Sequence, residues 1–193
     1  RDVAVTGVQT CALPIFLLPR SCDIGRADEG PLCDDGARLL MRAIVQRVSS
    51  ASVSIGEGRT RTVVGKIGPG LIVYLGVGRM DGEAQASAMA EKIAGLRIFM
   101  DEEEKMNLSI LDLGLEALVI SQFTLYADAR KGRRPSFDQA AGNQEARELY
   151  ESFVRHLRSQ GIHSEKGAFG QIMHIEAALE GPVSILLDSE KRF

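Results

Sequence analysis

Apolar residues alternate with polar ones over much of the first half of the domain, which predicts β-strands. The alternation covers residues 43–48 and 51–55, and the polar pair between these segments indicates a bend or bulge. Residues 62–67 show a similar pattern. After a Gly-Pro-Gly turn, residues 71–77 are apolar on both faces, which is typical of a central strand.

A spacing of three and four residues between apolar positions predicts two helices. The first covers residues 83–94, with Asp81 as the expected N-cap. The second covers residues 145–160 and ends at Gly161, a residue type that commonly follows the last turn of a helix.

The remaining apolar runs predict the strands of the second half. Residues 96–99 form a short expected strand, and residues 117–123 form a buried one. Residues 172–178 and 183–187 are the expected closing strands, joined by a tight connection at residues 179–182. Together these elements predict an α+β fold in which mixed or antiparallel sheets pack against two main helices.

Composition and charge narrow the class of protein. The 193 residues are 45% hydrophobic and 25% charged, as in an ordinary globular domain. No apolar run approaches the roughly 18 residues that span a bilayer, so no membrane partner is expected. A formal net charge of −3 excludes a generally basic surface, so any contact with RNA must come from a local basic patch.

The N-terminal segment differs from the rest of the chain. It holds all three cysteines, at spacings that match no compact metal motif. Residues 5–15 match the translation of a common short-read sequencing adapter. We therefore expect residues 1–40 to be a spurious or disordered extension and residues 41–193 to be a single domain. Because residues 41–193 contain no cysteine, a reducing cytoplasm is the expected location.

Several kinds of chemistry find no support in the sequence. His156, His163 and His174 are scattered without the spacing of metal ligands. We interpret His156 as a solvated helix residue and residues 101–104 as an acidic loop rather than a cation site. A Gly-x-Ser-x-Gly motif is absent. We therefore expect neither a metal nor another cofactor.

The side chains best suited to take part in a reaction lie at the end of a predicted strand. Ser121-Gln122-Phe123-Thr124 follows an apolar run and precedes a polar loop, where a rigid scaffold can present reactive groups. Taken alone, the segment fits a simpler function at least as well. In that function, the hydroxyl groups of Ser121 and Thr124 form hydrogen bonds with backbone groups at the end of the strand.

Five motifs in order give this segment a more specific interpretation. Together they resemble the D-aminoacyl-tRNA deacylase family, and the resemblance extends over residues 41–193. The motifs are Gln46-Arg47-Val48, Lys105-Met106-Asn107-Leu108, Ser121-Gln122-Phe123-Thr124-Leu125, Arg134-Pro135-Ser136-Phe137 and Gly181-Pro182-Val183-Ser184.

The resemblance implies a homodimeric deacylase-like fold with active sites at the subunit interface. It also implies hydrolysis of the ester bond of D-aminoacyl-tRNA, without metal or cofactor, as chiral proofreading in translation; glycine mischarged on tRNA-Ala is a further expected substrate. Two alternatives stay open at this point. One is a catalytically silent tRNA-binding module of the same fold, and the other is an editing relative that acts on another mischarged amino acid.

By resemblance, Ser121, Gln122, Phe123 and Thr124 form the catalytic segment. Backbone N–H groups near Phe123 are expected to face the ester carbonyl, and Thr124 is expected to be the hydroxyl nearest to the reaction. We do not expect Thr124 to be a covalent nucleophile, because no base in the sequence is evidently placed to activate it. A water molecule positioned in part by a hydroxyl group of the RNA is the expected nucleophile.

The resemblance assigns chiral selection to Gly181 and Pro182. In the family this pair has a cis peptide bond and enters the partner subunit's site, where two carbonyls face the α-amino group and leave no room for an L side chain. Arg47 is expected to hold this loop, the alternative being a surface arginine on a strand. The chain departs from the family pattern at Leu179-Glu180 and at Gln171-Ile172-Met173, which concerns the range of substrates.

A basic segment follows the expected catalytic residues. Arg130, Lys131, Arg133 and Arg134 are expected to contact phosphates of the tRNA acceptor stem. The alternative is a loop whose charges are merely solvated.

Overall fold

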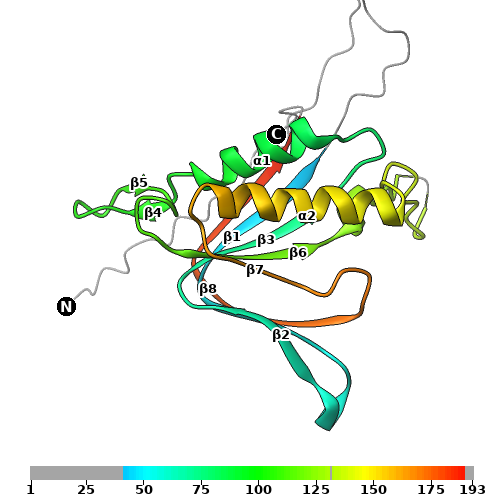
Figure 1. Ribbon diagram of the computed structural model, residues 1–193, viewed down its shortest axis with the longest axis horizontal. Helices are drawn as coiled ribbons and strands as arrows, with labels where there is room; N and C mark the ends of the chain where they lie inside the picture. Colours follow the sequence, from blue (N-terminus) through cyan, green and yellow to red (C-terminus); the bar gives the residue numbers. More distant parts are fainter. Residues whose placement is uncertain (1–40, 131, 190–193) are drawn as a thin grey trace, which may run out of the picture. The chain divides into compact units, whose positions relative to one another are not determined.

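The computed structural model describes residues 41–130 and 132–189. The expected N-terminal extension at residues 1–40 lies outside the described residues. Figure 1 shows a curved sheet with two helices packed against one of its faces. The fold is therefore α+β with a mixed sheet, as the sequence predicts.

A long first strand organises the sheet. β1 (Arg42–Ile55) pairs antiparallel with β3 (Gly70–Gly76) along its first half and with β2 (Thr62–Ile67) along its second. Between β1 and β2 lies a single turn of 3-10 helix, η1 (Gly58–Thr60). β8 (Met173–Asp188) pairs antiparallel along nearly all of one edge of β1. The opposite edge of β1 must therefore be shared by β2 and β3.

The sheet continues beyond β3 with parallel strands. β6 (Glu116–Ser121) pairs with β3, and β7 (Ser164–Lys166) pairs with β6. β2 approaches β7 so closely that a Cβ added at Gly65 would lie 2.9 Å from the carbonyl oxygen of Lys166. The sheet therefore curls back on itself.

A separate two-stranded sheet lies apart from this one. It consists of β4 (Phe99–Met100) and β5 (Met106–Leu108). The strand predicted at residues 96–99 was therefore placed too early. Local apolar pattern could not locate it, because its only partner strand is short and half-exposed.

β8 corrects a second prediction. It is one continuous strand rather than two strands joined by a tight connection. Gln46 of β1 pairs with Ser184 and Val48 pairs with Leu179, so residues 180–183 loop out as a bulge. Gly and Pro suit a bulge as well as a turn, and only the partner strand distinguishes the two.

Two helices cover one face of the sheet (Figure 1). α1 (Glu83–Ala94) has the predicted bounds, and α2 (Asn143–Ser159) begins two residues before the predicted start. The N-cap of α1 is Gly82 rather than Asp81. Asp81 is instead buried, and its carboxylate accepts a hydrogen bond of 2.6 Å from the N–H of Gly78. Asp81 thus forms a buried hydrogen bond with Gly78 instead of capping α1, which its local sequence favours.

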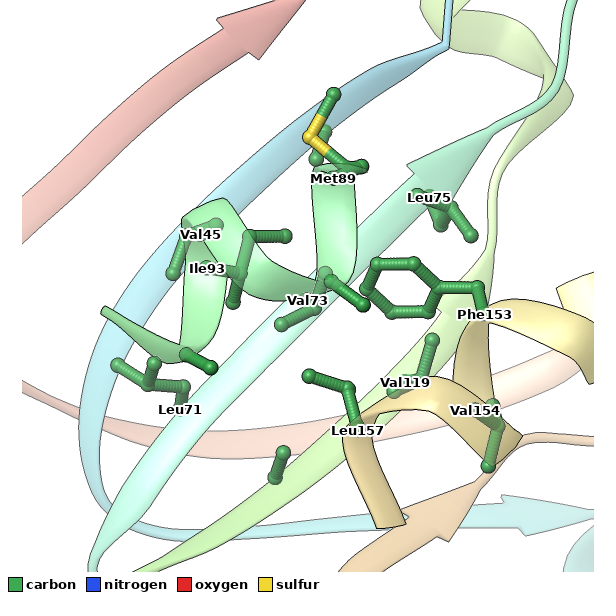
Figure 2. Close-up of a cluster of buried hydrophobic side chains, with 14 of the residues drawn as sticks. Val45, Leu71, Val73, Leu75, Met89, Ile93, Val119, Phe153, Val154 and Leu157 are labelled. Atoms are coloured by element: carbon green, nitrogen blue, oxygen red, sulfur yellow. The ribbon is translucent and has the colours of Figure 1, made fainter. Parts of the chain in front are cut away.

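The main core lies between the helices and the sheet, as Figure 2 shows. Alternate residues of β3 point to this core, and the intervening ones enter a second cluster on the other face, which confirms β3 as a central strand. Labelled members of the main core are Val45, Leu71, Val73, Leu75, Met89, Ile93, Val119, Phe153, Val154 and Leu157.

A polar cluster joins the two helices at their exposed edge. Glu83 of α1 accepts a hydrogen bond from the hydroxyl of Ser152 on α2, and its carboxylate lies 2.8 Å from Nε2 of His156. The bond from Ser152, followed by the contact with His156, lowers the pKa of Glu83. His156 thus links two helices, and its interpretation as merely solvated was wrong.

Candidate active site

The strand that leads to the predicted catalytic segment ends earlier than expected. β6 ends at Ser121, and Phe123 begins a 3-10 helix, η2 (Phe123–Tyr126), so the strand predicted to reach Phe123 was too long. The N–H of Gln122 still donates to the carbonyl of Leu75 on β3 at 2.8 Å. The chain turns immediately afterwards, which exposes the segment at the end of the sheet.

Close packing of η2 against β3 depends on a glycine. A Cβ at Gly76 would lie 3.0 Å from the ring of Tyr126 and 3.1 Å from the carbonyl oxygen of Gln122. Both distances are shorter than ordinary van der Waals contact. Gly76 therefore allows the turn to lie directly on the end of β3, a contact that the sequence pattern did not reveal.

A pocket of about 700 Å³ opens beside this turn. Its walls come from the ends of β3 and β6, the start of η2, the segment before α2 with its first turn, and the connection between β7 and β8 with the start of β8. None of the described residues that line it is charged. They are Val77, Ser121, Gln122, Phe123, Phe137, Ala140, Ala141, Asn143, Ala146, Phe169, Gly170, Gln171, Ile172, Met173 and Ile175.

Aromatic rings form two sides of the pocket. The ring of Phe123 meets that of Phe137 edge to face, with centroids 5.0 Å apart. On another side, Phe169 packs against Tyr150 and lies under the guanidinium of Arg147, 5.0 Å from it. Such rings provide flat apolar contact area for a base or an aromatic side chain. Neither Phe137 nor Phe169 was among the residues with a predicted role.

Thr124 has a different position from the other three predicted catalytic residues. Ser121, Gln122 and Phe123 line the pocket, whereas Thr124 is exposed and is not among the lining residues. Its hydroxyl accepts a hydrogen bond from the side-chain amide of Gln122. Thr124 therefore contacts the pocket through Gln122. A glutamine amide has two N–H donors, so one remains for a bound molecule.

The predicted selectivity residues lie on the bulge of β8. The Gly181–Pro182 peptide bond is cis, and Gly181 has φ +117°, a conformation that favours glycine. Arg47 is only 5% exposed, which excludes the surface alternative. Its guanidinium donates to the carbonyl of Ile98 at 2.6 Å and lies 3.9 Å from the carboxylate of Glu180. Arg47 is therefore a buried residue that lies beside the bulge.

Within one chain, the bulge and the pocket are separate. Arg47 pairs with Leu71, which pairs with Ala117, four residues before Ser121 on β6. At the usual rise per residue, this is roughly 13 Å along the strands, in addition to two strand spacings of about 5 Å. Neither Gly181 nor Pro182 lines the pocket. One chain thus brings Ser121, Gln122 and Phe123 together but does not bring the bulge to them.

The basic segment forms a loop beside the pocket. Reciprocal backbone hydrogen bonds of 2.9 and 3.0 Å between Asp128 and Ser136 close the loop. The guanidinium of Arg130 binds both carboxylate oxygens of Asp128, at 2.9 and 2.6 Å, which raises the pKa of Arg130. Arg133 and Arg134 are exposed, and Lys131 lies outside the described residues. Arg130 therefore has a carboxylate partner within the loop.

Two further classes of site are not seen in the part of the chain that the structure describes. No group of three or more histidine, cysteine, aspartate or glutamate residues there is arranged to hold a metal ion. Among the same residues, no helix has both the length and the apolar character needed to cross a bilayer.

Comparison with known proteins identifies the family of this chain. The family model described as D-Tyr-tRNA(Tyr) deacylase matches residues 44–188. A protein of Koribacter versatilis named D-aminoacyl-tRNA deacylase is 58% identical over 153 residues, which are 79% of this chain and 100% of that protein. A protein of Symbiobacterium thermophilum with the same name is 54% identical over 155 residues, covering 80% of this chain and 100% of that protein.

A solved structure with a different name has a similar fold. It is called c-Myc DNA Unwinding Element Binding Protein and superimposes with a TM-score of 0.70 at 36% identity. The match covers 77% of this chain and 98% of that one.

Proposed function

Since this chain belongs to the D-Tyr-tRNA(Tyr) deacylase family, we propose that the pocket beside β6 is its active site. The protein hydrolyses the ester bond of D-aminoacyl-tRNA, releasing the D-amino acid and the tRNA, and so acts in chiral proofreading. The observation that supports the location is an uncharged pocket at the end of a core strand, lined by Ser121, Gln122 and Phe123. Charged tRNA is used where translation occurs, which supports a cytoplasmic location.

The uncharged lining suits this substrate. An aminoacyl ester is already activated, so the site mainly has to orient it and stabilise the negative charge that develops on the carbonyl oxygen. The first N–H groups of a 3-10 helix have no acceptor inside the helix. We assign those of Phe123 and Thr124, at the start of η2, to this oxygen. The second N–H of the Gln122 amide is a further donor.

Water is the proposed nucleophile. Its oxygen bonds to the carbonyl carbon, the bond from that carbon to the ribose oxygen breaks, and the ribose oxygen receives a proton. Among the residues that the structure describes, no charged one lines the pocket to act as the base. A ribose hydroxyl of the substrate is therefore the proposed group that orients the water, as the family resemblance implies.

Selection by chirality requires a second copy of the chain in this proposal. Gly181 and Pro182 loop out of β8 on a bulge that Arg47 and Glu180 hold, and they do not line the pocket of their own chain. In a two-fold symmetric dimer each bulge would enter the other chain's pocket. Its backbone carbonyls would bind the α-amino group and exclude an L side chain. Glycine has no side chain to exclude, so glycyl esters are further proposed substrates.

Charged tRNA tests the function directly. We expect the full chain to release D-tyrosine from D-Tyr-tRNA, and glycine from Gly-tRNA, on the order of 100 times faster than L-tyrosine from L-Tyr-tRNA. The measurement is release of labelled amino acid under single-turnover conditions. Equal release of D- and L-tyrosine would instead indicate an editing relative without chiral selection. Binding of tRNA without any release would indicate a silent RNA-binding module.

The basic loop supports the proposed contact with the acceptor stem. Replacing Arg133 and Arg134 with Ala should weaken tRNA binding and reduce its salt dependence, because fewer counterions are released. Because this variant neutralises two fewer phosphates, the slope of log K against log salt should fall by about 1.4 to 1.8.

Lys92→Ala with Arg155→Ala is the matched control, because it also removes two exposed positive charges, which lie on α1 and α2 rather than on this loop. The rate at saturating substrate should change little in either protein. An unchanged affinity and salt slope in the Arg133/Arg134 variant would mean that the loop charges are only solvated.

A further inference from the structure

One buried carboxylate is hydrogen-bonded to residues that adjoin or share an element with the lining residues of two pocket walls. Asp81 is 5% exposed and lies between β3 and α1. Its Oδ2 accepts a hydrogen bond of 2.6 Å from the N–H of Gly78 and a longer one of 3.4 Å from the hydroxyl of Tyr126. Gly78 adjoins the lining residue Val77, and Tyr126 is the last residue of η2.

The bond to Gly78 supports the first wall. Gly78 forms a β-bridge with Ala140, and the N–H of Ala141 donates to the carbonyl of Val77 at 2.9 Å. Arg79 continues this pairing with Gln139 at 3.1 Å. Ala140 and Ala141 line the pocket, so the conformation of the Gly78 turn determines where this wall lies.

The bond to Tyr126 supports the second wall. Tyr126 is 3% exposed and anchors the end of η2, whose first residue, Phe123, lines the pocket. The guanidinium of Arg42 lies 4.8 Å above the Tyr126 ring and donates to the carbonyl of Leu125 at 2.9 Å. Neither Tyr126 nor Arg42 lines the pocket, so both η2 anchors come from outside it.

We propose that Asp81 is a positioning residue of the reaction, whose carboxylate keeps η2 and the Ala140–Ala141 wall in the arrangement that hydrolysis requires. The inference rests on the proposed function of this pocket. Asp81 does not line the pocket, so it acts through Gly78 and Tyr126 rather than on the substrate.

The charge of Asp81 makes the proposal testable by pH. Burial raises the pKa of Asp81 to about 6, and the bonds from Gly78 and Tyr126 oppose this rise. Glu145 raises the pKa further, and the backbone of Met41 lowers it. Burial also raises the pKa of Tyr126, as does the charge of Asp81, whereas Arg42 lowers it and Asp188 raises it. Tyr126 therefore stays a donor while Asp81 titrates.

Activity and stability should respond to acid in opposite directions. Protonation of Asp81 below pH 6 weakens both bonds to Oδ2, so the contribution of Asp81 to activity is lost as the pH falls. The pKa of Asp81 is higher in the folded protein than its ordinary value of 3.8, so the folded state binds this proton more readily. Through Asp81, acidification from pH 6 to 4 therefore stabilises the fold. Lost activity in that range cannot come from unfolding driven by this group.

The decisive variant is Asp81→Asn, which keeps the size of the side chain and removes its titration. We expect kcat/KM for D-Tyr-tRNA to fall about tenfold at pH 7.5, the loss that a modest misplacement causes. The ratio of wild-type to variant activity should decline toward one below pH 6. Both enzymes act on the same substrate, so titration of its amino group and the pH dependence of ester hydrolysis affect both rates equally and do not change the ratio. Asp112→Asn, at a turn outside the pocket, is the matched control and should leave the ratio independent of pH.

A second readout does not depend on activity. The amide proton and nitrogen shifts of Gly78 should titrate near pH 6 in the wild type and not in Asp81→Asn. Tyr126→Phe should lose part of the activity and keep the acid limb of the pH profile. If Asp81→Asn does not fold, two measurements still test the positioning role of Asp81: the titration of the Gly78 amide shifts in the wild type and the pH profile of Tyr126→Phe.

Two outcomes would overturn the inference: a ratio independent of pH, or an Asp81→Asn enzyme within twofold of wild type at pH 7.5. Failure of the proposed active site would look different. In that case, variants of Gln122 would retain full activity.

Discussion

Replacing Gln122 with Met is expected to lower kcat for D-Tyr-tRNA hydrolysis about 100-fold, the typical effect of removing one donor to a developing oxyanion. The Gln122 amide lies in the pocket, and Thr124 holds one of its two N–H groups. Met has a similar length without donors, so the pocket keeps its volume. Affinity for the tRNA should change little, because most of that binding comes from phosphate contacts.

Single-turnover rates with saturating enzyme measure this effect. Gln144→Met is the matched control: Gln144 is exposed on α2, bonds Glu148 of the same helix and does not line the pocket. Thr124→Val should have a smaller effect, on the order of tenfold, because it frees the Gln122 amide without removing it. If the Gln122 variant hydrolyses the substrate at the wild-type rate, the catalytic donors lie elsewhere.

Mixing two impaired variants should restore about half of the wild-type activity, because the proposed dimer has two equal composite sites. One chain carries Gln122→Met and the other carries Gly181→Ala. In the heterodimer, one site then contains both changes and the other contains neither. The intact site should hydrolyse D-Tyr-tRNA and spare L-Tyr-tRNA, as the wild type does.

Gly181→Ala is expected to disrupt the bulge for a local steric reason. A Cβ there would lie 2.8 Å from Cγ2 of Val183 and 3.2 Å from the guanidinium of Arg47, and φ is +117°. The heterodimer is isolated with two different affinity tags, and each homodimer is assayed beside it. If verified heterodimers are no more active or selective than the two homodimers, each chain completes its own site, and the shared-site proposal fails.

Local patterns predicted α1 and β2 well, because the arrangement of apolar and polar residues that indicates each element lies within the element itself. The apolar stripe of residues 83–94 reproduced α1, and residues 62–67 reproduced β2. Gly95 is the C-cap of α1 and lies directly after this stripe. The bounds of both elements could therefore be predicted from residues adjacent in the sequence.

Features that depend on a partner strand were predicted less well. The β8 bulge is defined by its register against β1, and the end of β6 is defined by the packing of η2 on Gly76. Asp81 satisfies the rules for an N-cap, but burial beside Tyr126 gives it another role. In each case an interaction between residues distant in sequence overrode a local preference.

The order of five motifs was enough to indicate the family, because those residues lie in short contiguous stretches. Only the tertiary structure decided how the pocket is closed, since its walls come from the end of β3, residues 137–146 and residues 169–175. It also showed that Arg47 is buried and donates to the carbonyl of Ile98, and that Asp81 accepts a hydrogen bond from Tyr126 of η2. The physical reason is that burial and hydrogen-bond partners are properties of the packed chain, so residues far apart in sequence determine them together.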